Sequence, residues 1–187
     1  YLKKIAIFTP IFVLFYGINT YGLHAKSLYL NPFGQLETEK WVQESPIQYF
    51  IGFFVNLIVK NTTATHWIVV GIGFIYFFIS TIYFDKNYFK NFEILKILYF
   101  TPFFLIIFSW MGKPDTFTVG SLLFLVAFNN SLSLSFTFIM ILVFSHPQVS
   151  IIYILLIKYL NIFKIKTIHY LSFVVSFVAY FIYLEQL

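Results

Sequence analysis

The sequence contains no arginine and no cysteine, and few of its residues carry a charge. All twelve basic residues are lysine, so no guanidinium can hold a phosphate through two parallel hydrogen bonds. The lack of cysteine excludes disulfides, zinc–thiolate sites and thiol nucleophiles. Only 10% of the residues are charged, against about 25% in soluble domains. These absences exclude an ordinary soluble domain.

Hydrophobic and aromatic residues take the place of the missing charges. They make up 60% and 24% of the chain, with 27 Phe and 14 Tyr. Tyrosine and tryptophan suit membrane–water interfaces, where one end of the ring is wet and the other apolar. The net charge of +5 does not indicate nucleic acid, because its distribution across a membrane matters more than its sum. We therefore expect a lipid bilayer as the main partner and no nucleic acid.

The apolar runs predict an all-α fold, a polytopic transmembrane helical bundle of about seven spans, since a span needs about 20 mostly apolar residues. Residues 1–187 are expected to form a single integral membrane domain, with a polar extramembrane loop at 22–46. The chain starts with Tyr1 and ends directly after an apolar run, so we expect a fragment of a longer protein or a processed product. The predicted spans are residues 3–20, 45–59, 65–84, 93–110, 116–145, 149–160 and 167–184.

The apolar segment 116–145 has two interpretations. As one helix of thirty residues it rises about 45 Å and completes seven spans, with Asp115 and His146 on opposite faces of the membrane. As a hairpin broken at 129–131 it makes eight spans and brings these two residues to the same face. In the single-helix interpretation, seven lysines lie on the N-terminal side of the membrane and five on the other side. In the hairpin interpretation, the numbers are four and eight. Because lysines accumulate on the cytoplasmic side, this division favours the single helix with the N-terminus inside.

Two compact polar motifs flank this segment. In Gly112-Lys113-Pro114-Asp115, Lys113 is suited to bind a phosphate and Asp115 to act as a base. The alternative is a turn at the membrane surface, with Asp115 as the N-cap of a helix that starts at Thr116.

The second motif, His146-Pro147-Gln148, follows an apolar run. Polar side chains at this position are costly unless they are used, so we interpret His146 and Gln148 as substrate-binding residues. His146 is able to neutralise a phosphate or relay a proton. The alternative is a helix end, where histidine suits the C-terminal dipole and proline stops or restarts a helix.

Glu37 and Glu39 lie in the polar loop 22–46 and are candidates for the general base. The alternative is a solvated acidic loop. The pair is a weak pattern for a divalent cation, because no His or Asp lies near it. We therefore predict no metal site and no cofactor, and leave a divalent cation open.

The order of a first span, an acidic outer loop, a proline-led second span and a later Gly-Lys-Pro-Asp motif resembles the GT-C-type polyprenol-phosphate-dependent glycosyltransferases. Residues 93–127 carry most of the likeness. The resemblance implies a membrane enzyme that moves a sugar from a polyprenyl phosphate to a lipid-linked or protein acceptor, with an outer-loop carboxylate as base. Such proteins carry an Asp soon after the first span, whereas residues 19–36 contain no acid. Glu37 or Glu39 would then take that role.

Two other functions remain open. A non-catalytic subunit of a larger membrane protein complex fits the small size and the phenylalanine-rich composition. A transporter is less favoured, because no acid is expected in the middle of a span. The host membrane is expected to be a bacterial inner membrane, with an organellar membrane as the alternative.

Overall fold

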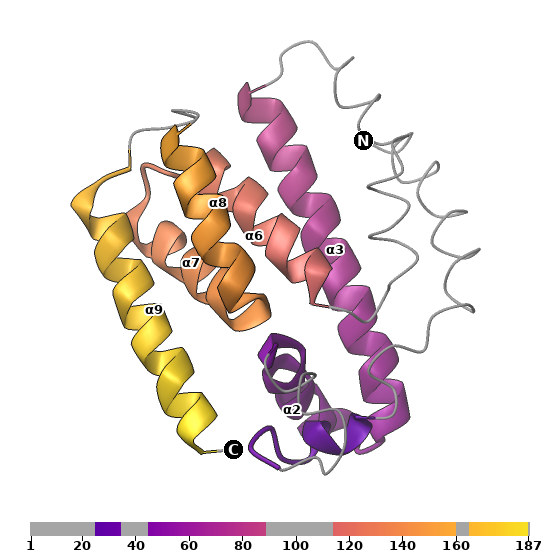
Figure 1. Ribbon diagram of the computed structural model, residues 1–187. Coiled ribbons are helices and arrows are strands. Elements are labelled where there is room, and N and C mark those ends of the chain that lie inside the picture. Colours follow the sequence, from indigo (N-terminus) through magenta and orange to yellow (C-terminus); the bar gives the residue numbers. More distant parts are fainter. Residues whose placement is uncertain (1–24, 35–44, 89–113, 160–164, 187) are drawn as a thin grey trace.

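The computed structural model describes residues 25–34, 45–88, 114–159 and 165–186. These residues are 84% helical and contain no strand, which confirms the all-α prediction for this part of the chain. The predicted spans 3–20 and 93–110 lie outside the described residues. The elements are the 3-10 helix η1 (Lys26–Tyr29) and the α-helices α2 (Ile47–Val59), α3 (Thr62–Tyr88), α6 (Asp115–Ala127), α7 (Leu132–Ser145), α8 (Pro147–Tyr159) and α9 (Thr167–Glu185) (Figure 1).

The described helices differ in length. Only α3 and α9 among them are long and apolar enough to cross a membrane. The helices α2, α6, α7 and α8 have 13 or 14 residues. Such a helix rises about 20 Å, which is less than the ~30 Å hydrocarbon core. The prediction of about seven spans, and of eight with a hairpin, is therefore wrong for this part of the chain, because the run 116–145 is divided into two short helices and α2 and α8 are themselves too short.

The segment 116–145 is a hairpin. Helix α6 ends at Ala127 and α7 begins at Leu132. In the turn, the Asn129 side-chain nitrogen donates to the Val126 carbonyl at 2.9 Å. Across the hairpin the rings of Phe124 and Phe138 stack with centroids 4.7 Å apart. The favoured single helix is thus wrong and the hairpin is confirmed, because an asparagine side chain can satisfy a carbonyl that a helix end leaves without an intrahelical partner.

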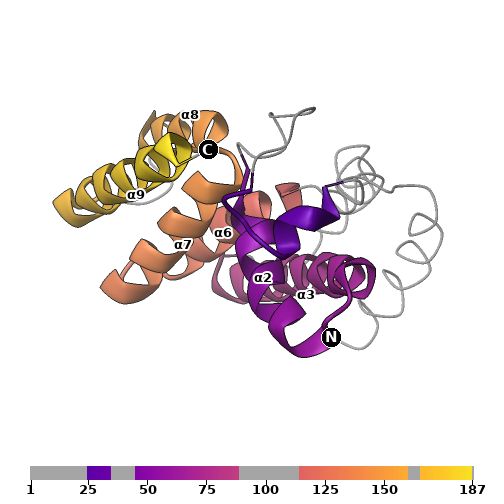
Figure 2. The same ribbon diagram turned by 90° about the horizontal axis from the view of Figure 1, so that it is seen from below.

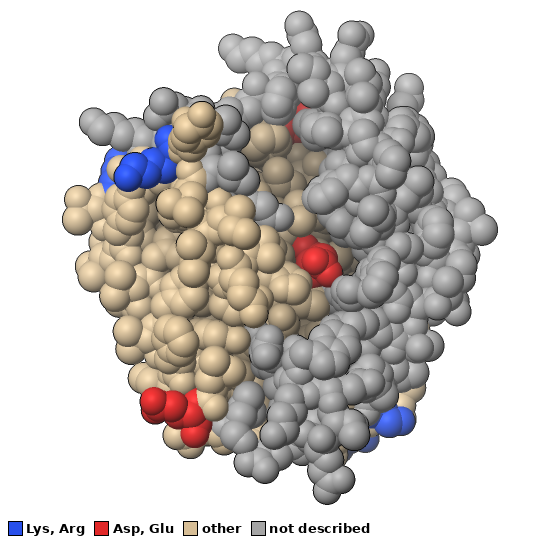
Figure 3. Space-filling model, viewed as in Figure 1, with Lys and Arg blue, Asp and Glu red and all other residues tan. Residues whose placement is uncertain are grey.

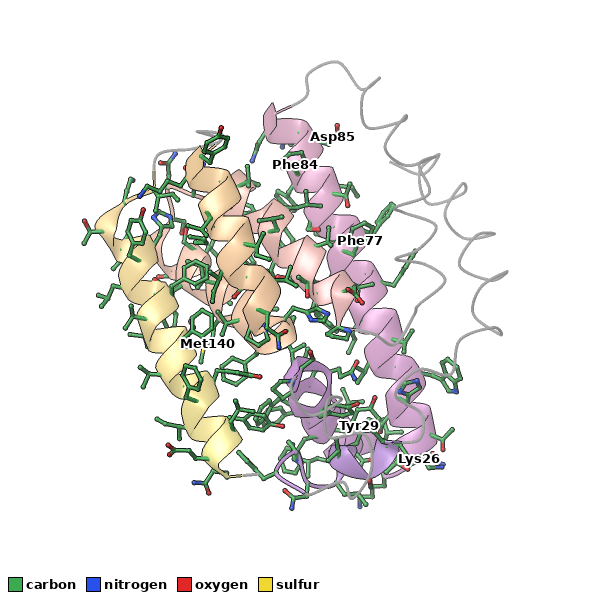
Figure 4. The ribbon with its side chains drawn as sticks, in the orientation of Figure 1. Lys26, Tyr29, Phe77, Phe84, Asp85 and Met140 are labelled. Atoms are coloured by element: carbon green, nitrogen blue, oxygen red, sulfur yellow. The ribbon has the colours of Figure 1, made fainter. Side chains whose placement is uncertain are left out.

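The described helices bury small polar side chains among apolar ones and expose many large apolar side chains. Serine and threonine side chains in the interior donate to carbonyls of their own helices, as Ser80 and Thr81 do to Phe77 at 2.7 Å. Large aliphatic side chains point outward, with Ile58 84% exposed. Where Figure 3 colours the described residues, they are mostly uncharged, and Figure 4 places Lys26 and Asp85 near opposite ends of α3. Small polar residues between helices and large apolar residues outside are typical of proteins in a bilayer.

Helices α3 and α6 pack closely and run parallel. A Cβ atom on Gly73 would lie 2.6 Å from the Thr116 hydroxyl, and one on Gly120 would lie 2.7 Å from the Tyr76 ring. The hydroxyls of Tyr76 and Ser121 share a hydrogen bond of 2.8 Å. Two glycines, one on each helix, therefore allow the close approach that fixes α6 against α3.

The helix η1 packs beneath α2 and α3 (Figure 2). The Tyr29 ring lies against Gly52 of α2, and its hydroxyl bonds to Nδ1 of His66 on α3 at 2.8 Å. Burial raises the pKa of the Tyr29 hydroxyl, so this group stays protonated. A part of the predicted polar loop is thus buried against the helices.

The sequence makes two local predictions in this region: a turn at 31–34, from Asn31, Pro32 and Gly34, and a helix with Ser45 as its N-cap and Pro46 as its first residue. The expected turn at 31–34 is confirmed by the hydrogen bond from Gly34 nitrogen to Asn31 oxygen at 2.9 Å. The expected helix start at Ser45-Pro46 is wrong by one residue, because Pro46 occupies the N-cap and Ile47 is the first helical residue.

Substitution of Gly73 tests the contact between α3 and α6. We expect Gly73→Ala to lower the free energy of unfolding by about 1–3 kcal/mol, because the added methyl group overlaps Thr116 and Phe117. Gly71→Ala is the matched control, since nothing lies within 4 Å of its Cβ position. It should leave stability unchanged or raise it by up to about 1 kcal/mol through helix propensity. Thermal unfolding in detergent, followed by circular dichroism, measures both, and equal destabilisation would contradict the packing.

Candidate functional site

His146 lies at the junction between α7 and α8. It is the C-cap of α7, and Pro147 begins α8. Its backbone has φ −151° and ψ 86°, outside the helical region, as expected for a residue that precedes proline. The prediction that this motif ends a helix is confirmed. The side chain is 28% exposed, so a ligand can reach the ring.

Asp115 is the first residue of α6. The prediction that it is the N-cap is wrong, because Pro114 is the N-cap and its carbonyl accepts from the backbone nitrogens of Phe117 and Thr118 at 3.0 Å. With φ fixed at −67°, Pro114 already has helical geometry and starts the helix one residue earlier. The Asp115 carboxylate lies near the positive end of the helix dipole.

The hairpin brings these two residues together. Nε2 of His146 lies 3.4 Å from Oδ1 of Asp115. This distance is longer than the ~2.7–3.2 Å of a strong hydrogen bond, but catalytic contacts in unliganded proteins often tighten only when substrate binds. The Asp115 side chain is 38% exposed. The pair is therefore accessible as well as close, as an acid–base site requires.

The Asp115–His146 pair lies at a level between the two ends of α3. Thr116 contacts α3 at Gly73, which is eleven residues from Thr62 and fifteen from Tyr88. At 1.5 Å per residue, the site is about 16 Å from one end of α3 and about 22 Å from the other. Helix α6 begins at this level, α7 ends there and α8 begins there (Figure 1).

Among the residues that the structure describes, few charges lie near this level. The described acids are Asp85, Asp115 and Glu185, and one acid lies in a hollow near the centre of the face in Figure 3. The other charges visible on that face lie toward its edges. A carboxylate and an imidazole at this level are costly to desolvate, and groups in such positions are commonly functional.

The other predicted site residues are not part of this contact. Gln148 is exposed on the first turn of α8. Lys113, Glu37 and Glu39 lie outside the described residues. Within the described ranges no three His, Asp or Glu side chains are grouped closely enough to hold a metal ion.

Sequence analysis missed a second polar cluster, in which Tyr29 meets His66 and the Thr65 hydroxyl donates to the Asn56 side chain at 3.0 Å. All four side chains are 0–9% exposed. The signal in the sequence was Asn56, Thr65 and His66 at the two ends of apolar runs. Because these groups are buried and bond to one another, they hold η1, α2 and α3 together.

Comparisons with protein-family models, with curated proteins and with solved structures gave no match. The geometry of the Asp115–His146 pair offers an imidazole whose Nε2 faces a carboxylate.

Cross-linking tests the pairing directly. Because the chain lacks cysteine, Asp115→Cys with His146→Cys introduces the only two thiols. We expect a short dithiol-reactive cross-linker to join them in membranes, as detected by a mobility shift after cleavage of the intervening loop. A single helix over 116–145 would separate them by about 45 Å and prevent the reaction. The matched control, Asp115→Cys with Ser131→Cys, places the second thiol at the other end of the hairpin and should not react.

Proposed function

We propose that the chain is a membrane glycosyltransferase, or a part of one, that transfers a sugar from a polyprenyl phosphate to a lipid-linked or protein acceptor. The observation that carries this proposal is the Asp115–His146 contact at 3.4 Å, far from the charged ends of the described helices. Glycosyl transfer needs a group that removes a proton from the acceptor hydroxyl, and a histidine held by a carboxylate is suited to this task.

The two residues have different roles in this proposal. In this proposal the Asp115 carboxylate accepts a hydrogen bond from Nε2–H of His146. This bond fixes the tautomer of the imidazole and leaves Nδ1 as the base. The Asp115 charge also stabilises the imidazolium that forms. The base role thus moves from a carboxylate, as the sequence suggested, to His146, with Asp115 as its positioning residue.

The reaction then proceeds by one displacement. Nδ1 takes the proton from the acceptor hydroxyl, and the acceptor oxygen forms a bond to the anomeric carbon. The bond from that carbon to the phosphate oxygen breaks, and its electron pair leaves with the lipid phosphate. Lys113, the cation nearest to Asp115 in the sequence, is our candidate for stabilising the leaving phosphate. Glu37 and Glu39 remain candidates for binding the acceptor or the sugar.

The membrane setting has its own support. The two long helices α3 and α9 have the length and hydropathy of spans, and the outer surface carries large aliphatic side chains. If α3 crosses the bilayer, the Asp115–His146 pair lies within the hydrocarbon layer rather than at its surface. We propose a bacterial inner membrane, with an organellar membrane as the alternative.

A transporter is the second candidate. The specific observation is that α6, α7 and α8 all begin or end at one level along α3, since broken helices that meet near the bilayer midplane form the sites of many transporters. In this arrangement the acid Asp115 lies at a level between the ends of α3, which answers the objection that no acid is expected in the middle of a span. Proton uptake by proteoliposomes in response to solute, without sugar transfer, would favour transport over catalysis.

Substitution of the pair tests the glycosyltransferase. We expect His146→Ala and Asp115→Asn each to lower the rate of transfer from a radiolabelled polyprenyl-phosphate sugar by about 10²–10⁴-fold, the usual contribution of a positioned base. The variant Glu185→Gln is the control, because it removes another exposed acid at the far end of α9. Membrane insertion is checked by fractionation. Normal transfer by both site variants would contradict the proposal.

A further inference from the structure

Gln48 lies in the first turn of α2, and its side chain is buried. It is 2% exposed, and its Nε2 has no hydrogen-bond partner among the residues that the structure describes. Pro46, the N-cap of α2, has no side-chain group that could bond to this turn. An unsatisfied amide donor in the interior costs free energy, so its presence calls for an acceptor from outside these residues.

The packing of α2 on α3 places Gln48 near the level of the candidate site. The next residue, Tyr49, belongs to one buried cluster with Val69 of α3. Val69 lies one helical turn, or about 6 Å, before Gly73, where α6 begins against α3. The first turn of α2 is therefore within about one helical turn of the level of Asp115.

The packing of α2 on α7 gives the same level independently. The rings of Phe50 and Phe144 meet with centroids 6.0 Å apart. Phe144 lies in the last turn of α7, which ends at the C-cap His146. In the view of Figure 1, α2 lies below α6 and α8. The start of α2 thus lies close to the level at which α6 and α8 begin and α7 ends.

The Gln48 side chain lies on the α3 side of α2. At 3.6 residues per turn, Gln48, Gly52 and Asn56 share one face of the helix. Asn56 accepts from the Thr65 hydroxyl of α3 on this face. Phe50 points to another face, about 200° from Gln48, and packs on α7. Because a helical side chain leans toward the start of its helix, the Gln48 amide lies over the first turn of α2.

The first turn of α2 adds backbone donors to this amide. The nitrogens of Tyr49 and Phe50 donate to the Pro46 carbonyl at 2.9 and 3.1 Å. The nitrogens of Ile47 and Gln48 come too early in the helix to reach a carbonyl of α2. The start of α2 therefore offers N–H groups of the backbone and of one buried side chain to a ligand oxygen.

These donors favour an uncharged oxygen. The start of a helix ordinarily attracts anions, but the Asp115 carboxylate lies near the same level and would repel a second negative charge. A carbonyl oxygen accepts hydrogen bonds without adding charge, and it carries no proton that needs an acceptor of its own, as a hydroxyl does. Among sugar substituents, the acetamido group carries such a carbonyl.

We propose that Gln48 determines the specificity of the site for a 2-acetamido sugar, because its Nε2 donates to the acetamido carbonyl of the sugar donor. The inference rests on the proposed function for the transfer itself, and it adds the class of sugar. The acetamido group is attached to the carbon next to the anomeric carbon, so its carbonyl is only a few bonds from the reacting centre. Gln48 lies correspondingly close in level to the Asp115–His146 pair.

Equilibrium binding tests the assignment without measuring transfer. The protein is reconstituted in phosphatidylcholine nanodiscs and titrated by calorimetry with farnesyl phosphate that carries N-acetylglucosamine or glucose, which differ only at the second carbon. The N-acetylgalactosamine and galactose compounds form a second pair. We expect the acetamido sugar of at least one pair to bind about tenfold more tightly, as a buried hydrogen bond allows. Equal affinity within both pairs would overturn the proposal.

Substitution of Gln48 assigns this preference to its amide. Methionine is unbranched like glutamine but has no donor, so Gln48→Met should abolish the preference by weakening the acetamido sugar alone. Gln186→Met is the matched control, because Gln186 is exposed and follows the end of α9, and it should keep the preference. A preference that persists in Gln48→Met contradicts the assignment.

Thermal unfolding separates a binding role from a structural one. Gln48→Met removes a buried donor that has no partner among the described residues, so the unfolding temperature should stay the same or rise. A clear fall in that temperature would show that the amide supports the fold, and would count against a binding role.

The two proposals fail in different ways. Loss of transfer in His146→Ala together with equal affinity within both sugar pairs contradicts the role of Gln48 and leaves the glycosyltransferase standing. Normal transfer in His146→Ala together with a preference that Gln48→Met abolishes contradicts the glycosyltransferase mechanism and leaves a binding site for acetamido sugars.

Discussion

The close packing of α6 on α3 is the constraint on which the arrangement of the site depends. Gly73 and Gly120 let the two helices approach until Thr116 and Tyr76 lie against the facing backbones. The hydrogen bond between Tyr76 and Ser121 then fixes how far α6 lies along α3. Because Asp115 is the first residue of α6, this contact sets the level of its carboxylate. The hairpin returns the chain to the same level and places His146 beside it.

Short helices explain why polar groups are found at that level. A helix of 13 or 14 residues that ends inside the molecule leaves backbone groups without intrahelical partners. Some are satisfied locally: the Leu142 carbonyl, near the end of α7, accepts from the backbone nitrogen of His146. The same helix ends supply a dipole that favours the Asp115 carboxylate. The helices therefore end at the same level at which their dipoles can stabilise a charged side chain.

Sequence reasoning was accurate where local chemistry decides the structure. The turn at 31–34 follows from Asn, Pro and Gly, and the helix end at His146 follows from the proline after it. It failed where a decision depended on distant contacts. The division of lysines between two sides assumed that every apolar run crosses a membrane, whereas α6 and α7 together form a hairpin of short helices. The alternative interpretation of Asp115 was the N-cap of its own helix, whereas Pro114 is the N-cap and the Asp115 side chain contacts His146 across the hairpin.

By itself, the sequence determined that this chain is helical and apolar, that it lacks thiols and guanidinium groups, and that polar side chains flank residues 116–145. These properties follow from composition and from local backbone preferences. Only the tertiary structure decided that Asp115 and His146 meet, and that the start of α2 lies near their level. The reason is that hydropathy reports how much apolar surface a segment has, while close packing of glycines and aromatic rings decides which segments bury it together.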